Sequence, residues 1–188
     1  MNEELKNNIL NILKQGQKAI IENDVVTLKN LSSQTLHSAS VLQDEDSVSI
    51  AILMYALSKM FERTHYTEYK DWGVFYKTCL TSLKSAEENL AKDNLVVYQE
   101  NIKGILNLAE RLESHLKLYM KEVLEKAKIH QASRLHEHGI SVGKTAKILG
   151  ITQWELMEYV GKTGIADVSF SVTKTAAERL KLTRGLFK

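Results

Sequence analysis

The sequence predicts an all-α protein. The two main reasons are that helix-breaking residues are scarce and that apolar residues recur at helical spacing. The 188 residues include nine glycines and no proline, so the residues that interrupt helices are scarce. Hydrophobic residues make up 44% of the chain, enough for a core. We expect an N-terminal helical bundle, a long connecting helix and a C-terminal helix-turn-helix, followed by one short strand and a final helix.

Four helices are expected in the N-terminal part. Apolar spacing predicts the first over residues 3–22 and the second over 25–36, with Asn23-Asp24 as its cap. The third, 48–61, should be capped by Asp46 or Ser47, and it is apolar on nearly every side, which is typical of a helix at the centre of a bundle. The fourth, 72–90, follows Asp71 as its cap and carries Cys79 in its apolar stripe, where we expect a buried thiol.

A single long helix is expected between residues 93 and 138, because Gly104 is its only breaker. It would be about 65 Å long at roughly 1.5 Å per residue. Its apolar positions alternate spacings of four and three, as in a coiled-coil seam, so this helix could also form a dimer interface. We place a boundary within it, between a bundle of residues 1–125 for dimerisation or partner binding and a C-terminal part of residues 126–188. The seam consists of Ile105, Ala109, Leu112, Leu116, Tyr119 and Val123.

Residues 139–160 predict two short helices joined by a tight turn at Gly150, where a left-handed residue is needed. Thr152 and Glu155 have the spacing of a capping box at the start of the second helix. Two short helices joined in this way form a helix-turn-helix, which is most often used on DNA. The apolar contacts of this corner are expected from Ala146, Leu149, Ile151, Trp154, Met157 and Val160.

Residues 166–172 alternate apolar and polar side chains, which predicts a strand. A single strand leaves its backbone groups unpaired, so we expect it to pair with its copy in a second chain. A last helix is predicted from residue 176 to about 186.

The charge of the chain is unevenly distributed. Its net value is +2, but residues 126–188 hold eleven Lys and Arg against five Asp and Glu, whereas residues 1–125 hold fourteen against eighteen. This asymmetry indicates an anionic partner for the C-terminal third. The N-terminus has no signal-peptide pattern and the most apolar window, 48–57, is too short to span a membrane, so we expect a soluble cytoplasmic protein.

Residues 132–165 resemble a family of small prokaryotic antitoxin-like DNA-binding proteins. The resemblance covers under a fifth of the chain, and Thr145 replaces the first alanine of the family's usual pair. It implies a helix-turn-helix that binds DNA, in a protein often encoded next to a toxin. The matching residues are Ile140-Ser141, Gly143-Lys144, Ala146, Leu149-Gly150-Ile151-Thr152, Trp154-Glu155-Leu156, Val160 and Gly164-Ile165.

The second helix of the motif is the expected reader of base edges, because residues near the N-terminus of a recognition helix reach them. Gln153 has the chemistry to bond adenine, and Glu155 to accept from a cytosine amine. A helix that contacts protein stays open as an alternative, since Glu155 also has a capping role and glutamates are unfavourable beside phosphates. The base-contact candidates are Thr152, Gln153, Glu155 and Glu158. The phosphate-contact candidates are Lys144, Lys147, Lys162, Lys174, Arg179, Lys181 and Arg184.

No pattern of residues predicts catalysis, a metal or a cofactor. The glycines of Gly139-x-x-x-Gly143-Lys144-Thr145 have the wrong spacing and setting for a phosphate-binding loop. His136 and His138, two positions apart on a helix, point in different directions and cannot share a metal. We therefore expect a homodimeric transcriptional regulator that binds double-stranded DNA. The alternative is an antitoxin-like or adaptor module that binds a protein, and RNA or ribosome binding is a weaker variant.

Overall fold

The fold is entirely helical over the part of the chain that the computed structural model describes, residues 1–42, 44–62, 69–108 and 115–163. The described helices are α1 (Glu3–Ile21), α2 (Val25–Leu42), α3 (Glu45–Phe61), α4 (Trp72–Ala91), α5 (Leu95–Leu106), α6 (His115–Glu137), α7 (Val142–Leu149) and α8 (Gln153–Thr163). The all-α prediction is thus confirmed. The predicted strand 166–172 and the last helix 176–186 lie outside the described residues.

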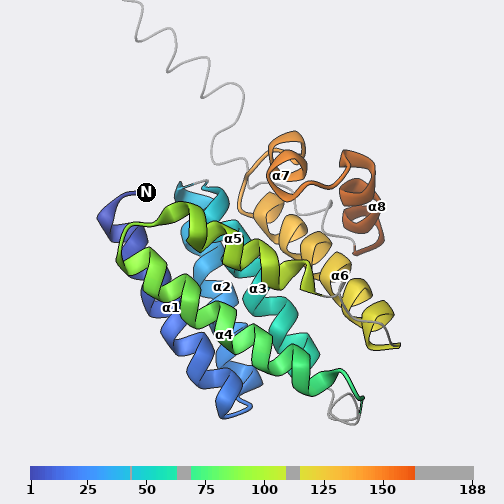
Figure 1. The fold of residues 1–188 in the computed structure, drawn as a ribbon. Coiled ribbons are helices and arrows are strands. Elements are labelled where there is room, and N and C mark those ends of the chain that lie inside the picture. Colours follow the sequence, from blue (N-terminus) through green and yellow to red (C-terminus); the bar gives the residue numbers. More distant parts are fainter. Residues whose placement is uncertain (43, 63–68, 109–114, 164–188) are drawn as a thin grey trace, which may run out of the picture.

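Helices α1 to α5 form a bundle, and α6 lies along its side (Figure 1). Neighbouring helices along the chain pair up, α1 with α2, α2 with α3 and α4 with α5, while α4 also packs on α1. Helix α3 contacts α1, α2, α5, α6 and α7. Its apolar residues are buried almost all round, so the prediction of a central helix is confirmed.

Short polar side chains form the turns before α2 and α5 and the cap of α2. Asn23 and Asp93 adopt left-handed φ angles of 54° and 59°, a conformation that Asn and Asp tolerate better than most residues. Asp24 accepts hydrogen bonds from the backbone N–H and the hydroxyl of Thr27, at 2.9 and 2.6 Å, so it caps α2 as predicted.

The predicted cap of α3 is wrong, and the predicted cap of α4 is right in position only. Helix α3 begins earlier than expected, with Asp44 at the N-cap accepting from the backbone N–H of Ser47 at 2.7 Å. Asp71 does occupy the N-cap of α4, but its side chain makes no capping hydrogen bond. Cys79 of α4 is fully buried, and burial raises the pKa of its thiol to about 12, as expected for a thiol that serves only in packing.

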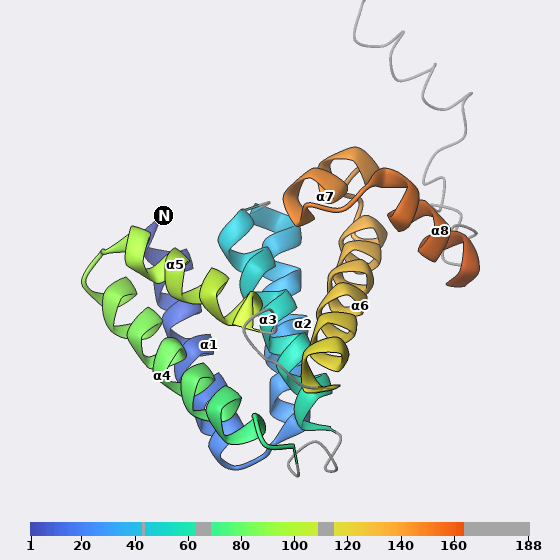
Figure 2. The same cartoon turned by 45° about the vertical axis from the view of Figure 1, so that its right-hand side comes forward.

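The single long helix predicted over 93–138 is wrong. Helix α5 ends at Leu106, where the N–H of Asn107 bonds to the carbonyls of Lys103 and Ile105, and the next described helix is α6, His115–Glu137. The break lets α5 fold back on α4 while α6 packs against α3 and α2 (Figure 2). Ile105 of α5 and Leu116 of α6 are both buried in the core. The dimer interface expected from one long helix therefore loses its basis, and the predicted boundary at residue 125 falls within α6.

A buried hydrogen-bond relay fixes α6 on the bundle. The Gln131 amide donates to Ser32 Oγ at 3.0 Å, and Ser32 donates to the carbonyl of Ala51 at 2.7 Å. All three residues are buried. Arg134 adds a bond to Ser33 Oγ at 3.1 Å. Because buried polar groups are costly without partners, this relay specifies one position of α6 against α2 and α3.

Candidate functional site

Helices α7 and α8 lie beside the C-terminal half of α6, at one end of the molecule (Figure 2). Helix α6 ends at Glu137 and is followed by Gly139, which has a φ angle of 90°, and the N–H of Ile140 bonds back to the carbonyl of Leu135 at 3.2 Å. Ser141 then caps α7 by accepting from the N–H of Lys144. Gly139 thus turns the chain away from α6, and Ser141 begins α7 near the end of α6.

The turn between α7 and α8 depends on Gly150, whose φ and ψ of 63° and 32° are left-handed. The N–H of the following Ile151 bonds to the carbonyl of Ala146 at 3.1 Å, which closes the end of α7. Ala146 and Leu149 are buried beneath the turn. The left-handed glycine is as the sequence predicted.

The capping box at the start of α8 is confirmed in full. Thr152 donates from its N–H and its hydroxyl to Glu155 Oε2, at 2.8 and 2.7 Å, and the N–H of Glu155 donates to Thr152 Oγ1 at 3.1 Å. The hydroxyl and backbone N–H of Thr152 lower the pKa of the Glu155 carboxyl, so it stays ionised at neutral pH. Both side chains are thereby committed to the helix start.

The buried face of α8 differs from the predicted one. Trp154 and Met157 were expected to pack in the corner, but they are 85% and 49% exposed, whereas Leu156 and Val160 are buried. Residues 156 and 160 are one helical turn apart and point at α6, and this rotates Trp154 and Met157 to the outside. The outer face of α8 therefore combines an apolar patch with the carboxylates of Glu155 and Glu158.

The predicted DNA contacts divide into those that the structure places and those that it does not. Lys144 and Lys147 are exposed on α7, one turn apart, and Gln153 is exposed at the start of α8 beside Gly143. Lys162 belongs to α8, but its side chain lies outside the description. Lys174, Arg179, Lys181 and Arg184 also lie outside the described residues. The structure thus brings two lysines and Gln153 onto neighbouring helices, with Glu155 and Glu158 nearby.

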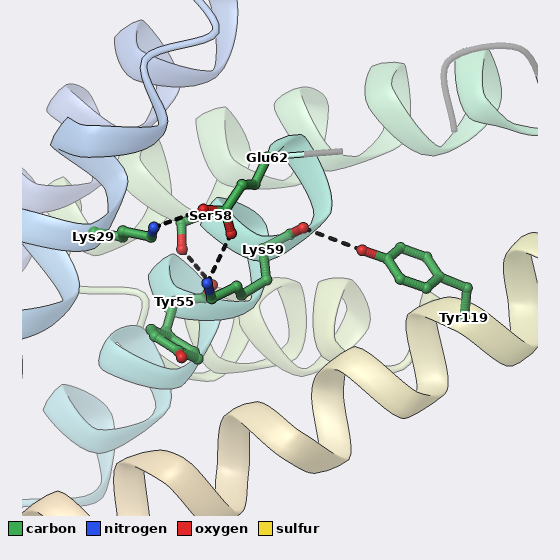
Figure 3. A network of polar contacts seen from close by, with 6 residues as sticks. All are labelled: Lys29, Tyr55, Ser58, Lys59, Glu62 and Tyr119. Carbon is green, nitrogen blue, oxygen red and sulfur yellow. Dashed lines mark hydrogen bonds and ion pairs between the residues drawn. The ribbon is translucent and has the colours of Figure 1, made fainter. Parts of the chain in front are cut away.

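A second cluster of polar side chains was not predicted. It lies on the side of α3 that faces α6 and α2 (Figure 3). Glu62 accepts from Lys59 at 2.7 Å and from Lys29 at 2.9 Å, and these two ammonium groups lower its pKa to about 2. The Tyr119 hydroxyl of α6 donates to the carbonyl of Lys59 at 3.2 Å. One available sequence signal was the spacing of Tyr55, Lys59 and Glu62, which places three polar residues on one face of an apolar helix.

Comparison with models of protein families, with curated proteins and with solved structures finds no match to this chain. Within the described ranges, every helix is too short or too polar to cross a lipid bilayer. In the same part of the chain, no three His, Cys, Asp or Glu residues gather closely enough to hold a metal ion.

Proposed function

We propose that this protein is a DNA-binding transcriptional regulator, and that α7, the turn at Gly150 and α8 form its helix-turn-helix. The observation that carries the proposal is the outward presentation of two short helices joined by a left-handed glycine, with Lys144 and Lys147 exposed on the first. A helix-turn-helix places its second helix in the major groove while its first helix crosses the backbone. The two α7 lysines are therefore suited to contact phosphates.

Base reading falls mainly to Gln153. Thr152 and Glu155 are engaged in the capping box, so their side chains would have to give up hydrogen bonds to reach bases. Gln153 is exposed at the N-terminal end of α8, and its amide can pair with the N6 and N7 of adenine. Glu158 is also exposed on this helix and keeps its proposed place at the base edges.

The affinity for DNA must come from positive groups other than residues 152–158, because Glu155 and Glu158 repel phosphates. Lys144 and Lys147 supply part of it, and Lys162, Lys174, Arg179, Lys181 and Arg184 are proposed to add contacts to neighbouring phosphates. A homodimer would place two α8 helices in successive major grooves of a two-fold symmetric site. In that dimer, we propose that the 166–172 segments of the two chains pair.

A second function is favoured by the exposed face of α8. Trp154 and Met157 are large apolar side chains held out in solvent beside two glutamates. Tryptophan and methionine are enriched at protein interfaces, and the glutamates would suit a basic partner. The second candidate is accordingly an antitoxin-like or adaptor protein that binds its partner through this face of α8.

Selection of bound sequences from a pool of random duplexes separates the two functions. If α8 reads DNA, the wild-type chain enriches a symmetric sequence, and Gln153→Ala relaxes selection at one position per half-site by about 1–3 kcal/mol. Lys117→Ala, at the far end of α6, should leave that selection unchanged. Failure of the wild-type chain to enrich any sequence argues against DNA reading. Recovery of a stoichiometric basic partner that is lost with Trp154→Ala, but kept in Lys144→Ala, favours the adaptor.

A further inference from the structure

A cavity of about 450 Å³ lies where α3, α6 and α8 meet. Its volume is within the range of about 300–1,000 Å³ that is usual for small-molecule sites. Tyr55 of α3, Tyr119 and His130 of α6, and Tyr159 of α8 contribute aromatic rings to its lining. The cavity therefore joins the bundle to α8 and is bounded by rings from each of the three helices.

The aromatic lining is uncharged at neutral pH. The imidazole of His130 stacks on the Tyr55 ring, with centroids 4.5 Å apart and an angle of 6° between the planes. Burial, reinforced by the charge of Arg134, lowers the pKa of His130, so this ring is neutral. Burial also raises the pKa values of Tyr55 and Tyr159. Flat, neutral rings of this kind favour an aromatic guest, which can pack against them in stacked or edge-on geometry.

The charged side chains of the lining are partly exposed and lie in ion pairs. Lys59 and Lys126 line it together with Glu62 and Glu122, and Glu62 carries Lys29 as a second ammonium partner. Lys29 does not line the cavity, so the lining itself holds two lysines and two glutamates. Farther back, Arg134 and Glu137 both act on His130 and oppose each other.

Lys126 is the ammonium best placed to meet a ligand. Its side chain is 74% exposed and pairs with Glu122 one turn away on α6. Exposed pairs of this type contribute at most about 1 kcal/mol, so exchanging Glu122 for a ligand anion costs little. Lys59 is less available, because its side chain is only 35% exposed.

We propose that this cavity binds a planar aromatic monoanion, such as an aryl carboxylate. The ring lies among the tyrosines and His130, and the carboxylate meets Lys126 at the edge. An aliphatic acid would lose the ring contacts, and a cationic aromatic amine would be repelled by the exposed ammonium of Lys126. Because Tyr159 belongs to α8, a bound ligand contacts the bundle and α8 together and is an effector of α8. Ligand binding stands without the proposed DNA function, whereas an effect on DNA affinity rests on it.

Isothermal titration calorimetry with 2-naphthoate tests the site in the absence of DNA. We expect saturable 1:1 binding, with weaker binding of the uncharged 2-naphthamide, of cyclohexanecarboxylate and of the cationic 2-naphthylmethylammonium. Lys126→Ala should weaken 2-naphthoate binding by about three- to tenfold, the range for a charge-assisted bond at an exposed position. The same change should not affect 2-naphthamide.

The chain offers a matched control for the exposed ammonium. Lys128 pairs with Glu125 on the same helix at 3.3 Å but does not line the cavity, so Lys128→Ala should bind 2-naphthoate as the wild type does. Val123→Trp, at a half-buried wall position, should block binding by filling the space. Its helical circular dichroism and thermal midpoint would establish that it folds.

The proposal is overturned by absence of saturable 2-naphthoate binding at millimolar concentration, or by equal affinity for the amide or the cation. Equal losses in Lys126→Ala and Lys128→Ala would overturn the assigned carboxylate position. If 2-naphthoate binds as expected while no duplex DNA is bound with or without it, the proposed DNA function fails and the ligand site stands. If DNA is bound but 2-naphthoate is not, the proposed ligand site fails and the proposed DNA function stands.

Discussion

Replacing Gly150 by alanine tests the turn on which the proposed helix-turn-helix depends. Its φ of 63° is left-handed, and a Cβ added there meets no atom within 4 Å, so the effect is conformational and involves no clash. A left-handed L-residue costs about 1–2 kcal/mol, and alanine recovers roughly 0.4–1 kcal/mol by restricting the unfolded chain. We expect a net loss of about 1 kcal/mol, or a thermal midpoint lower by about 2–4 °C in a chain of this size.

Gly161→Ala is the matched control in the same pair of helices. Gly161 lies within α8 without a positive φ, and a Cβ there also meets no atom within 4 Å. Alanine should stabilise this helical position by up to about 0.5–1 kcal/mol. Urea unfolding followed by circular dichroism measures both variants, which should shift in opposite directions. A Gly150→Ala variant as stable as the wild type would refute the left-handed turn.

Two further predictions concern the bundle. Glu62→Gln should destabilise the protein by about 1 kcal/mol at pH 7, a value kept small because the Glu62 side chain is 42% exposed. The folded pKa of Glu62, about 2, lies below its ordinary value of 4.5. Its contribution is therefore present above about pH 4.5 and is lost as the pH falls toward 2. Urea midpoints of the two proteins should converge over that interval, and a constant gap would contradict the role of Lys59 and Lys29. Separately, Ser32→Ala should cost about 1–3 kcal/mol by leaving the buried Gln131 amide without its partner. Adding Gln131→Leu should restore part of this loss in the same unfolding assay, and additive losses would show that the pair is not coupled.

The sequence predicted most helices of the bundle because their apolar faces are periodic and their breaks are polar. It failed between α5 and α6, where neither proline nor a suitably placed glycine marks the end of α5 at Leu106. That break is tertiary in origin, since folding back lets α5 cover α4 and lets α6 cover α3. The helix propensity of individual residues does not reflect such gains in tertiary packing.

Helix α8 shows a different limit of sequence patterns. Trp154, Met157 and Val160 make one apolar stripe, and Leu156 with Val160 makes another, so either face was a reasonable choice for burial. Packing against α6 selects the second and leaves Trp154 in solvent. The cavity lining was not predictable either, because Tyr55, Tyr119 and Tyr159 are far apart in the chain and meet only in the folded protein.

The salt dependence of duplex binding by the Lys144→Ala/Lys147→Ala double variant is the most direct test of the proposed DNA-binding surface. Each phosphate contact contributes about 0.9 to the slope of log affinity against log salt. In fluorescence anisotropy, the double variant should therefore lose about 2 units of slope relative to the wild type. The control, Lys117→Ala/Lys121→Ala, removes two exposed lysines at the far end of α6 and should keep the wild-type slope. Wild-type binding without salt dependence, or equal slopes for the wild type and both double variants, would contradict DNA binding through α7 and α8.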